Sequence, residues 1–400
     1  MSEAFLCDAV RTPIGKLNGT LATIRADDLA ALPIRALIDR NSGVDWSALD
    51  DVILGCANQA GEDNRNVARM AVLLAGLPDC VPAYTVNRLC ASGLNALGNA
   101  AQAIRSGDAD IIIAGGVESM TRAPYVLGKA EAAFGRAQTI QDTTLGWRFV
   151  NPAMKRAFGV DTMPQTGENV AAQWGITRDA QDQFALASQQ KAARARLTGR
   201  LAAEIVPVLV PQPQAASVLF EHDEHPRETS IDALRKLQPV VMHDGTVTAG
   251  NAAGLNDGAA AMFVVSEASA KRHGLIPRAR IVGMASAGVP PRVMGIGPVE
   301  AAKRLLARTG LSIADFDVIE LNEAFASQAV ATLRDLGVEA TDPRVNPNGG
   351  AIALGHPLGM SGARIAMSAA EELVRQGGKR ALCFMCVGVG QGVALMLERV

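Results

Sequence analysis

Two cysteines and one histidine stand in separate glycine-rich segments of this 400-residue chain. Cys90 lies in NRLCASGL, His356 in NGGAIALGHP and Cys386 in CVGVGQG. A thiolate can attack a carbonyl carbon, an imidazole can take the proton of that thiol, and a second thiol can move a further proton. Together these residue types predict acyl transfer through a thioester.

Each of the three residues also has an ordinary structural interpretation, because a free cysteine or a lone histidine is commonly a packed core residue. Two surroundings favour chemistry. Cys90 is expected at the N-terminus of a helix, where the helix dipole lowers the pKa of a thiol and backbone N–H groups can receive an oxyanion. The glycines around His356 let a ligand approach the backbone closely.

Cys386 is expected at the end of a strand, three residues after Cys383. The resulting C-x-x-C spacing has no second ligand pair elsewhere in the chain, so it does not predict a metal site. Asn322, in NEAF, follows another predicted strand. It is equally suited to hold a water or a carbonyl oxygen and to cap the next helix.

The remaining histidines are expected at the surface. Acidic residues surround two of them, but their spacing matches no metal template and predicts a solvated polar loop. The four histidines are His222, His225, His243 and His273.

Strand-like and helix-like patterns alternate along the chain, which predicts an α/β fold. Residues 111–116 are a short apolar run typical of a strand buried on both faces, and residues 91–104 are typical of a buried helix. The apolar stretch 381–397 is interrupted by glycines and is shorter than the roughly 20 residues of a membrane span. It predicts two strands joined by a glycine-rich turn.

A weak internal repeat relates the two ends of the chain. Residues 47–54 resemble residues 312–319, and aligning the shared Asp-Val-Ile and its counterpart gives an offset of 266 residues. The same offset relates Cys90 to His356. Two facing copies of an α/β unit would therefore bring both residues to one centre.

Composition distinguishes three parts of the chain and excludes some classes of partner. We expect an N-terminal half in residues 1–120, completed by 249–275, a charge-rich inserted lid in 121–248, and a C-terminal half in 276–400. A net charge of −2 without a basic block excludes nucleic acid as a partner. An early acid and the lack of an apolar leader exclude a signal peptide, and six cysteines in 400 residues predict a reducing cytoplasm.

The segments around Cys90, Asn322, His356 and Cys386 resemble those of the thiolases in order and spacing, along essentially the whole chain. The segments GGVESM and TAGN do so as well. Residues 61–71 and 142–152 are most similar to family members that act on 3-oxoadipyl-CoA (β-ketoadipyl-CoA) in aromatic catabolism.

The resemblance implies a five-layered αβαβα fold of two βαβαβαββ halves with an inserted lid, assembled as a homotetramer, a dimer of dimers. It implies acyl-CoA and coenzyme A (CoA) as reactants, with no metal or other cofactor and no membrane partner. Cys90 would attack the 3-oxo carbon, His356 would activate it, and Cys386 would protonate the departing enolate. One oxyanion site would use His356 and a water held by Asn322, the other the N–H groups of Cys90 and Gly388.

The resemblance also implies which residues bind substrate. Met163, Ala253 and Phe325 would lie on the CoA side. Many thiolases have serine where this chain has Ala253, and losing one neutral hydrogen bond would weaken CoA binding by about 0.5–1.5 kcal/mol. A dicarboxylic substrate would need a cation, for which the chief candidates are Arg65 and Arg148. Other basic residues of the same segments are Arg69, Arg122 and Lys155.

Two other functions remain open at this point. One is a biosynthetic acetoacetyl-CoA thiolase that runs the same chemistry in reverse, and the other is a non-catalytic relative that binds CoA or lipid. The complete set of Cys90, His356 and Cys386 argues against the second. A decarboxylating condensing enzyme would need Cys90 but not Cys386.

Overall fold

Ten strands form the central sheet of this computed structural model, which describes residues 2–212 and 215–400. Met1 and residues 213–214, which belong to the predicted first half and lid, lie outside the described residues. The strand order is β12-β13-β14-β11-β1-β10-β5-β3-β4, with β2 beside β10. The strands are β1 (Ala4–Arg11), β2 (Gly15–Lys16), β3 (Asp51–Gly55), β4 (Ala83–Val86), β5 (Ile111–Ser119), β10 (Asn256–Ser266), β11 (Ala279–Gly288), β12 (Val318–Leu321), β13 (Arg380–Val387) and β14 (Gln391–Arg399).

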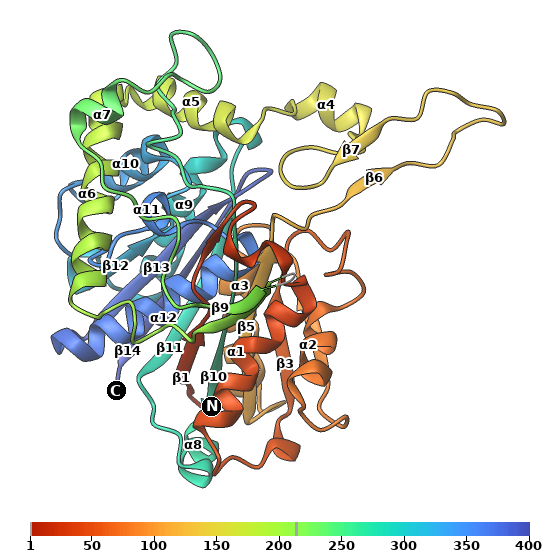
Figure 1. The fold of residues 1–400 in the computed structure, drawn as a ribbon. Helices are drawn as coiled ribbons and strands as arrows, with labels where there is room; N and C mark the ends of the chain where they lie inside the picture. Colours follow the sequence, from red (N-terminus) through yellow and green to blue (C-terminus); the bar gives the residue numbers. More distant parts are fainter. Residues whose placement is uncertain (1, 213–214) are drawn as a thin grey trace.

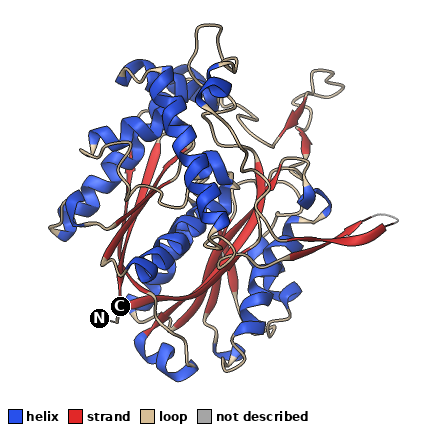
Figure 2. Ribbon diagram, turned by 60° about the vertical axis from the view of Figure 1, so that its left-hand side comes forward, coloured by secondary structure: helices blue, strands red, loops and turns tan. Residues whose placement is uncertain are grey.

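The sheet divides into two halves where β1 meets β11, because these strands pair only at Phe5–Arg280 and Leu6–Ala279. Helices α3 (Ser92–Ser106) and α12 (Leu358–Gln376) lie between the halves (Figures 1 and 2). Helices α1 (Ala26–Arg40) and α2 (Val67–Ala75) cover the outer face of the first half, and α9 (Gly297–Thr309) and α10 (Ala326–Asp335) cover that of the second. These are the five predicted layers.

The alternation of side chains along β5 shows how the layers pack. Ile112 and Ala114 point into the core shared with α3 and α12, whereas Ile111 and Ile113 join the core under α1 and α2. A strand buried on both faces therefore needs a continuous apolar run, which is why the sequence of β5 does not alternate. The predicted buried strand is confirmed.

The predicted repeat is also visible in the fold. Helices α3 and α12 begin at Ser92 and Leu358, which are 266 residues apart, as are Cys90 and His356. In the second half, the counterpart of β4 is reduced to an isolated parallel bridge between Ile319 and Val345. The stretch 381–397 forms β13, a turn and β14, as expected. None of the described helices is long and apolar enough to cross a membrane.

Among its described residues, the segment between β5 and β10 holds the hairpins β6–β7 and β8–β9 and four helices. Figure 1 places α4, α5 and α7 at one end of the molecule, with the β6–β7 hairpin extending away from it. The bounds are β6 (Tyr125–Leu127), β7 (Ile140–Asp142), α4 (Pro152–Phe158), α5 (Met163–Trp174), α6 (Arg178–Leu197), β8 (Val208–Gln212), β9 (Ala215–Phe220) and α7 (Ile231–Arg235). The short helices α8 (Glu267–His273) and α11 (Ala351–Leu354) lie outside this segment.

The acidic run before α7 is not the solvated loop that its sequence predicts. Asp223 is buried and accepts two hydrogen bonds from the fully buried Arg11, at 2.7 and 2.9 Å. Glu224 accepts the hydroxyl of Thr20 at 2.9 Å. Burial lowers the pKa of His225 to about 4. His225 is therefore only partly exposed, because the run closes over a buried cation from a distant strand.

The other three histidines vary in exposure. His222 and His243 are exposed, as expected. His273 is partly buried, and its Nδ1 accepts the backbone N–H of Asp45 at 3.3 Å.

Replacing Asp223 with alanine should destabilise the fold by about 3–5 kcal/mol, because it leaves Arg11 buried with only Glu204 as its anionic partner. Urea unfolding followed by circular dichroism would measure the change. Glu221→Ala is the matched control two residues away, since Glu221 is exposed and should change stability by less than about 0.5 kcal/mol. Equal unfolding midpoints for the two variants would contradict this prediction.

Candidate active site

A cavity of about 450 Å³ contains most of the residues predicted for the site. Its wall is largely apolar, with Leu89, Leu145 and Met294 among the lining residues. These apolar side chains would pack more favourably against the thioester arm of an acyl-CoA than against water. The predicted residues that line it are Cys90, Arg148, Met163, Ala253, Phe325, His356 and Gly388.

Cys90 lies in the tight turn between β4 and α3. The preceding residue, Leu89, has φ of 46°, a left-handed conformation that costs a non-glycine residue about 1–3 kcal/mol and is common at functional sites. Ser92 holds the turn, since its hydroxyl donates to the Leu89 carbonyl at 2.6 Å and accepts the Arg88 N–H at 2.9 Å. The turn presents Cys90 to the cavity at the start of a helix, as predicted.

Burial, with a smaller contribution from the charge of Glu118, raises the pKa of Cys90 to about 11. A hydrogen bond from the backbone N–H of Gly388 acts in the opposite direction but does not overcome the loss of solvent. The sequence-based expectation of a lowered pKa is therefore wrong for the free thiol. Cys90 is protonated near neutral pH and needs a base to become a nucleophile.

His356 is suited to be that base. It is 6% exposed, and burial, followed by the charge of Arg364, lowers its pKa to about 4, so the imidazole is neutral at neutral pH. The hydroxyl of Ser361 donates to the Pro357 carbonyl at 2.8 Å, so it must accept from His356 Nδ1, at 2.6 Å. This assigns the proton to Nδ1 and leaves Nε2 free to accept one.

Asn322 directly follows β12 and lies beside this nitrogen, with its Nδ2 3.5 Å from His356 Nε2. Its Oδ1 is buried and has no hydrogen-bond partner among the described residues. The alternative role as a helix cap is excluded, because α10 begins at Ala326 with Phe325 in the capping position. An unsatisfied buried carbonyl next to an imidazole is consistent with a water-binding role.

Cys386 lies at the end of β13, as predicted, and packs behind the cavity wall against Met294 and Phe325. Burial raises the pKa of its thiol far above the ordinary range, and the proximity of Cys90 adds to this rise. Ionising one cysteine therefore favours the protonated form of the other. This coupling suits a pair that exchanges protons in turn.

Comparison with known protein families agrees with the resemblance found in the sequence motifs. Residues 4–268 match the thiolase N-terminal domain, and residues 275–399 match the thiolase C-terminal domain. The chain belongs to the thiolase family.

Several known relatives match this thiolase-family enzyme over its full length. A beta-ketoadipyl-CoA thiolase of Pseudomonas aeruginosa is 63% identical over 399 residues, covering 100% of this chain and 99% of the relative. A 3-oxoadipyl-CoA/3-oxo-5,6-dehydrosuberyl-CoA thiolase of Escherichia coli is 61% identical, with 100% of both chains covered. The crystal structure of an acetyl-CoA acetyltransferase of Bacillus anthracis superposes with a TM-score of 0.93 at 39% identity, covering 100% of this chain and 99% of that one.

The enzyme's candidate cations differ sharply in position. Arg65 is exposed on the loop before α2 and outside the cavity, so its predicted role in binding substrate is not supported by the fold. Arg69 donates to backbone carbonyls, including that of Asp79 at 2.9 Å, and Arg122 is paired with Glu62. Among the described residues that line the cavity, Arg148 is the only lysine or arginine.

Sequence reasoning missed two residues that support the site. Ser361 orients His356, and a serine five residues after a histidine gives no clear signal in advance. Glu118 accepts backbone N–H groups from Ala57, Asn58 and Gly359 at 2.8–3.0 Å, and so joins the two halves beside the cavity. The sequence does mark Glu118 as unusual, because it is a lone carboxylate in an apolar strand.

Glu118 also lies close to two other groups that could bind metal, Cys56 and Asp63, whose ligand atoms fall within 4.8 Å of one another. Burial raises the pKa of Glu118 to about 7. Both of its carboxylate oxygens already accept backbone N–H groups, so the arrangement fits a structural anchor.

Proposed function

We propose that this enzyme cleaves 3-oxoadipyl-CoA with CoA to give succinyl-CoA and acetyl-CoA, in the degradation of aromatic compounds. The observation that carries the proposal is a single cation, Arg148, on the wall of a cavity that also presents Cys90 and His356. Relatives named for this substrate share about 60% of the sequence over its full length. Arg148 would pair with the distal carboxylate of the acyl chain.

The first half of the proposed reaction forms an acyl-enzyme. His356 Nε2 takes the Cys90 proton, and the thiolate attacks the 3-oxo carbon of the substrate. The N–H groups of Cys90 and Gly388 stabilise the resulting oxyanion. Collapse breaks the C2–C3 bond and expels the enolate of acetyl-CoA, whose oxygen faces His356 and the water held by Asn322. Cys386 gives its proton to C2, and acetyl-CoA leaves.

The second half regenerates the enzyme. The Cys386 thiolate takes the proton of the incoming CoA thiol, and the CoA thiolate attacks the succinyl group on Cys90. Cys90 leaves as a thiolate, recovers its proton from His356, and succinyl-CoA departs. Every proton is returned within one cycle, so the thioester chemistry requires no metal or redox cofactor in this proposal.

Replacing Arg148 with methionine tests the proposed substrate. Loss of one charge-assisted contact should lower kcat/KM for 3-oxoadipyl-CoA by about 10–150-fold, equivalent to about 1.5–3 kcal/mol. The same variant should leave kcat/KM for acetoacetyl-CoA unchanged, since that substrate has no distal carboxylate. Arg65→Met, which removes an exposed arginine outside the cavity, is the control and should behave as the wild type.

The wild-type comparison of the two substrates is decisive on its own. Higher kcat/KM for 3-oxoadipyl-CoA supports the proposal. Equal or higher kcat/KM for acetoacetyl-CoA refutes it and indicates an acetoacetyl-CoA thiolase instead.

We also propose a homotetramer located in the cytoplasm. Strand β4 is at an edge of the sheet, and exposed apolar side chains lie beside it on α2, a combination that favours pairing with a second copy. The extended β6–β7 hairpin exposes Tyr125 and Ile140, which would give a second contact surface. Light scattering should give about four times the chain mass of 41.7 kDa. A monomer would refute this assembly.

A further inference from the structure

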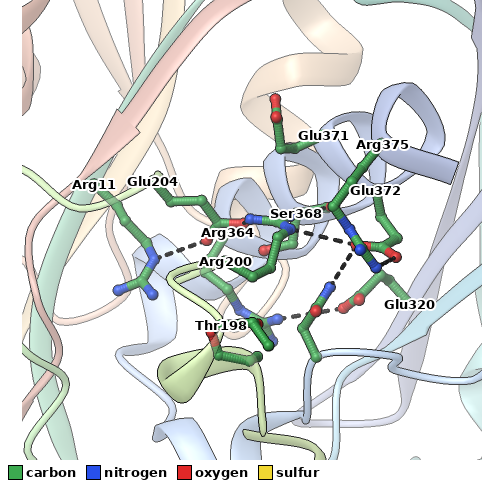
Figure 3. Close-up of polar contacts among 12 residues, drawn as sticks. Arg11, Thr198, Arg200, Glu204, Glu320, Arg364, Ser368, Glu371, Glu372 and Arg375 are labelled. Atoms are coloured by element: carbon green, nitrogen blue, oxygen red, sulfur yellow. Dashed lines mark hydrogen bonds and ion pairs between the residues drawn. The ribbon is translucent and has the colours of Figure 1, made fainter. Parts of the chain in front are cut away.

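A buried ion pair lies behind the active site, between helix α12 and strand β12. Arg364 Nη1 is 3.3 Å from Glu320 Oε2, and the two side chains are 2% and 0% exposed. Figure 3 shows the pair within a larger network of buried charges, in which Arg200 contacts Glu204 and Glu372. Burying two charges is rarely stabilising, since an apolar pair of similar volume is often at least as stable. The pair is therefore a candidate for positioning other residues rather than for stabilising the fold.

The pair closes a ring of contacts around His356. His356 Nδ1 is 2.6 Å from Ser361 Oγ, and Ser361 lies three residues before Arg364, on the same face of α12. Glu320 lies on β12, two residues before Asn322, which directly follows the strand. Asn322 Nδ2 is 3.5 Å from His356 Nε2. Three polar contacts and two short backbone segments thus form a closed ring that contains the imidazole of His356 and the amide of Asn322.

The ring also places a positive charge near the imidazole. Apart from burial, the charge of Arg364 is the cause that lowers the pKa of His356. The other titratable groups around this site are Cys90 and Glu118 on the cavity wall and Cys386 behind it. Glu323 is buried next to Asn322 and accepts the hydroxyl of Ser188 at 2.7 Å, while Glu320 and the buried thiol of Cys383 lie close to Arg364 itself. Arg364 is thus the only cation in this set of described groups.

We propose that Arg364 and Glu320 are positioning residues, which fix His356 and Asn322 relative to each other and hold a positive charge one helical turn from the serine that contacts the imidazole. The inference rests on the proposed roles of His356 and Asn322 in the reaction. It extends them to two residues that line no part of the cavity.

Arg364→Met and Arg364→Lys separate the two parts of the proposal. Methionine removes the charge and the contact, so kcat should fall about tenfold or more with KM within about twofold, because small misplacements of catalytic groups are costly. The acidic limb of the pH profile of kcat/KM should move to higher pH, since the pKa of His356 rises. Burial raises the pKa of Glu320 and the charge of Arg364 lowers it, so loss of Arg364 raises this pKa further and favours the protonated, uncharged carboxyl.

The Arg364→Lys variant keeps the positive charge but lacks the planar guanidinium group of arginine. Its kcat should fall while the acidic limb stays in place. If the methionine variant does not fold, the lysine variant still decides the positioning role, since wild-type kcat in Arg364→Lys would refute it. An unmoved acidic limb in a folded Arg364→Met protein would overturn the electrostatic role.

Arg200→Met is the matched control, because Arg200 belongs to the same buried network but contacts Glu204 and Glu372, away from His356. It should lower thermal stability and leave the acidic limb in place. The same shift in both variants would mean a general effect of lost core charge and would refute the proposal.

A readout without substrate separates this inference from the proposed substrate. Alkylation of Cys90 by iodoacetamide, followed by mass spectrometry of its peptide, should be slower in Arg364→Met than in Arg200→Met at the same pH. This comparison holds whichever acyl-CoA the enzyme prefers. Equal alkylation rates, each matching the wild type, would count against the positioning role.

Discussion

Replacing Cys90 with serine is expected to abolish the acyl-enzyme and to lower kcat by at least about 10⁴-fold. The neutral His356 can take a proton from a thiol but is far too weak a base for a hydroxyl. Intact-protein mass spectrometry after mixing with 3-oxoadipyl-CoA should show an added succinyl group on the wild type and none on the variant. The result also tests the non-catalytic alternative, which predicts no adduct on either protein.

Cys80→Ser is the appropriate control, since Cys80 is exposed and free. It should form the adduct and turn over like the wild type. A succinylated Cys90→Ser protein, or normal turnover by it, would remove Cys90 from the mechanism.

Replacing Cys386 with serine should produce the second large effect, a loss of about 10³-fold in carbon–carbon bond cleavage. The hydroxyl is a much weaker acid than a thiol and cannot protonate the enolate efficiently. Transfer of an acyl group from a simple acyl-CoA to Cys90 needs no enolate and should persist at a reduced rate. Steady-state cleavage of 3-oxoadipyl-CoA and isotope exchange between succinyl-CoA and labelled CoA would separate the two steps.

Cys383→Ser tests whether position matters on this strand. Cys383 lies three residues earlier on β13, is buried, and has its thiol 3.8 Å from the Ile365 carbonyl. It should retain cleavage. Equal loss of cleavage in both variants would indicate a packing defect rather than proton transfer.

Much of the fold and the central residues could be predicted because their signals are local. The apolar run of β5 and the glycine-rich turns lie within short stretches of sequence, and the repeat is found by matching two such stretches 266 residues apart. The positions of Cys90 before a helix, and of Asn322 and Cys386 at strand ends, follow from the same patterns and are confirmed.

What could not be predicted depends on contacts between distant segments. Arg65 and Arg148 both stand in distinctive loops, and only the folded chain shows which one lines the cavity. Asp223 lies in a run that resembles a surface loop, yet a buried arginine on β1 requires its charge. The high pKa of Cys90 has the same origin, because local sequence shows a helix start but not the removal of water around it.

The equivalence of Cys90 and His356 has an evolutionary consequence. If two identical copies of one half faced each other, the central pair of positions would hold two thiols or two imidazoles, and neither pair combines a nucleophile with its base. Joining the halves in one chain lets the copies diverge, so that one supplies the sulfur and the other the proton acceptor. Cys56 and Asn322, which follow β3 and β12 at the same 266-residue spacing, show a similar division. Divergence of the two halves thus gives one asymmetric catalytic centre at a place where identical copies would be symmetric.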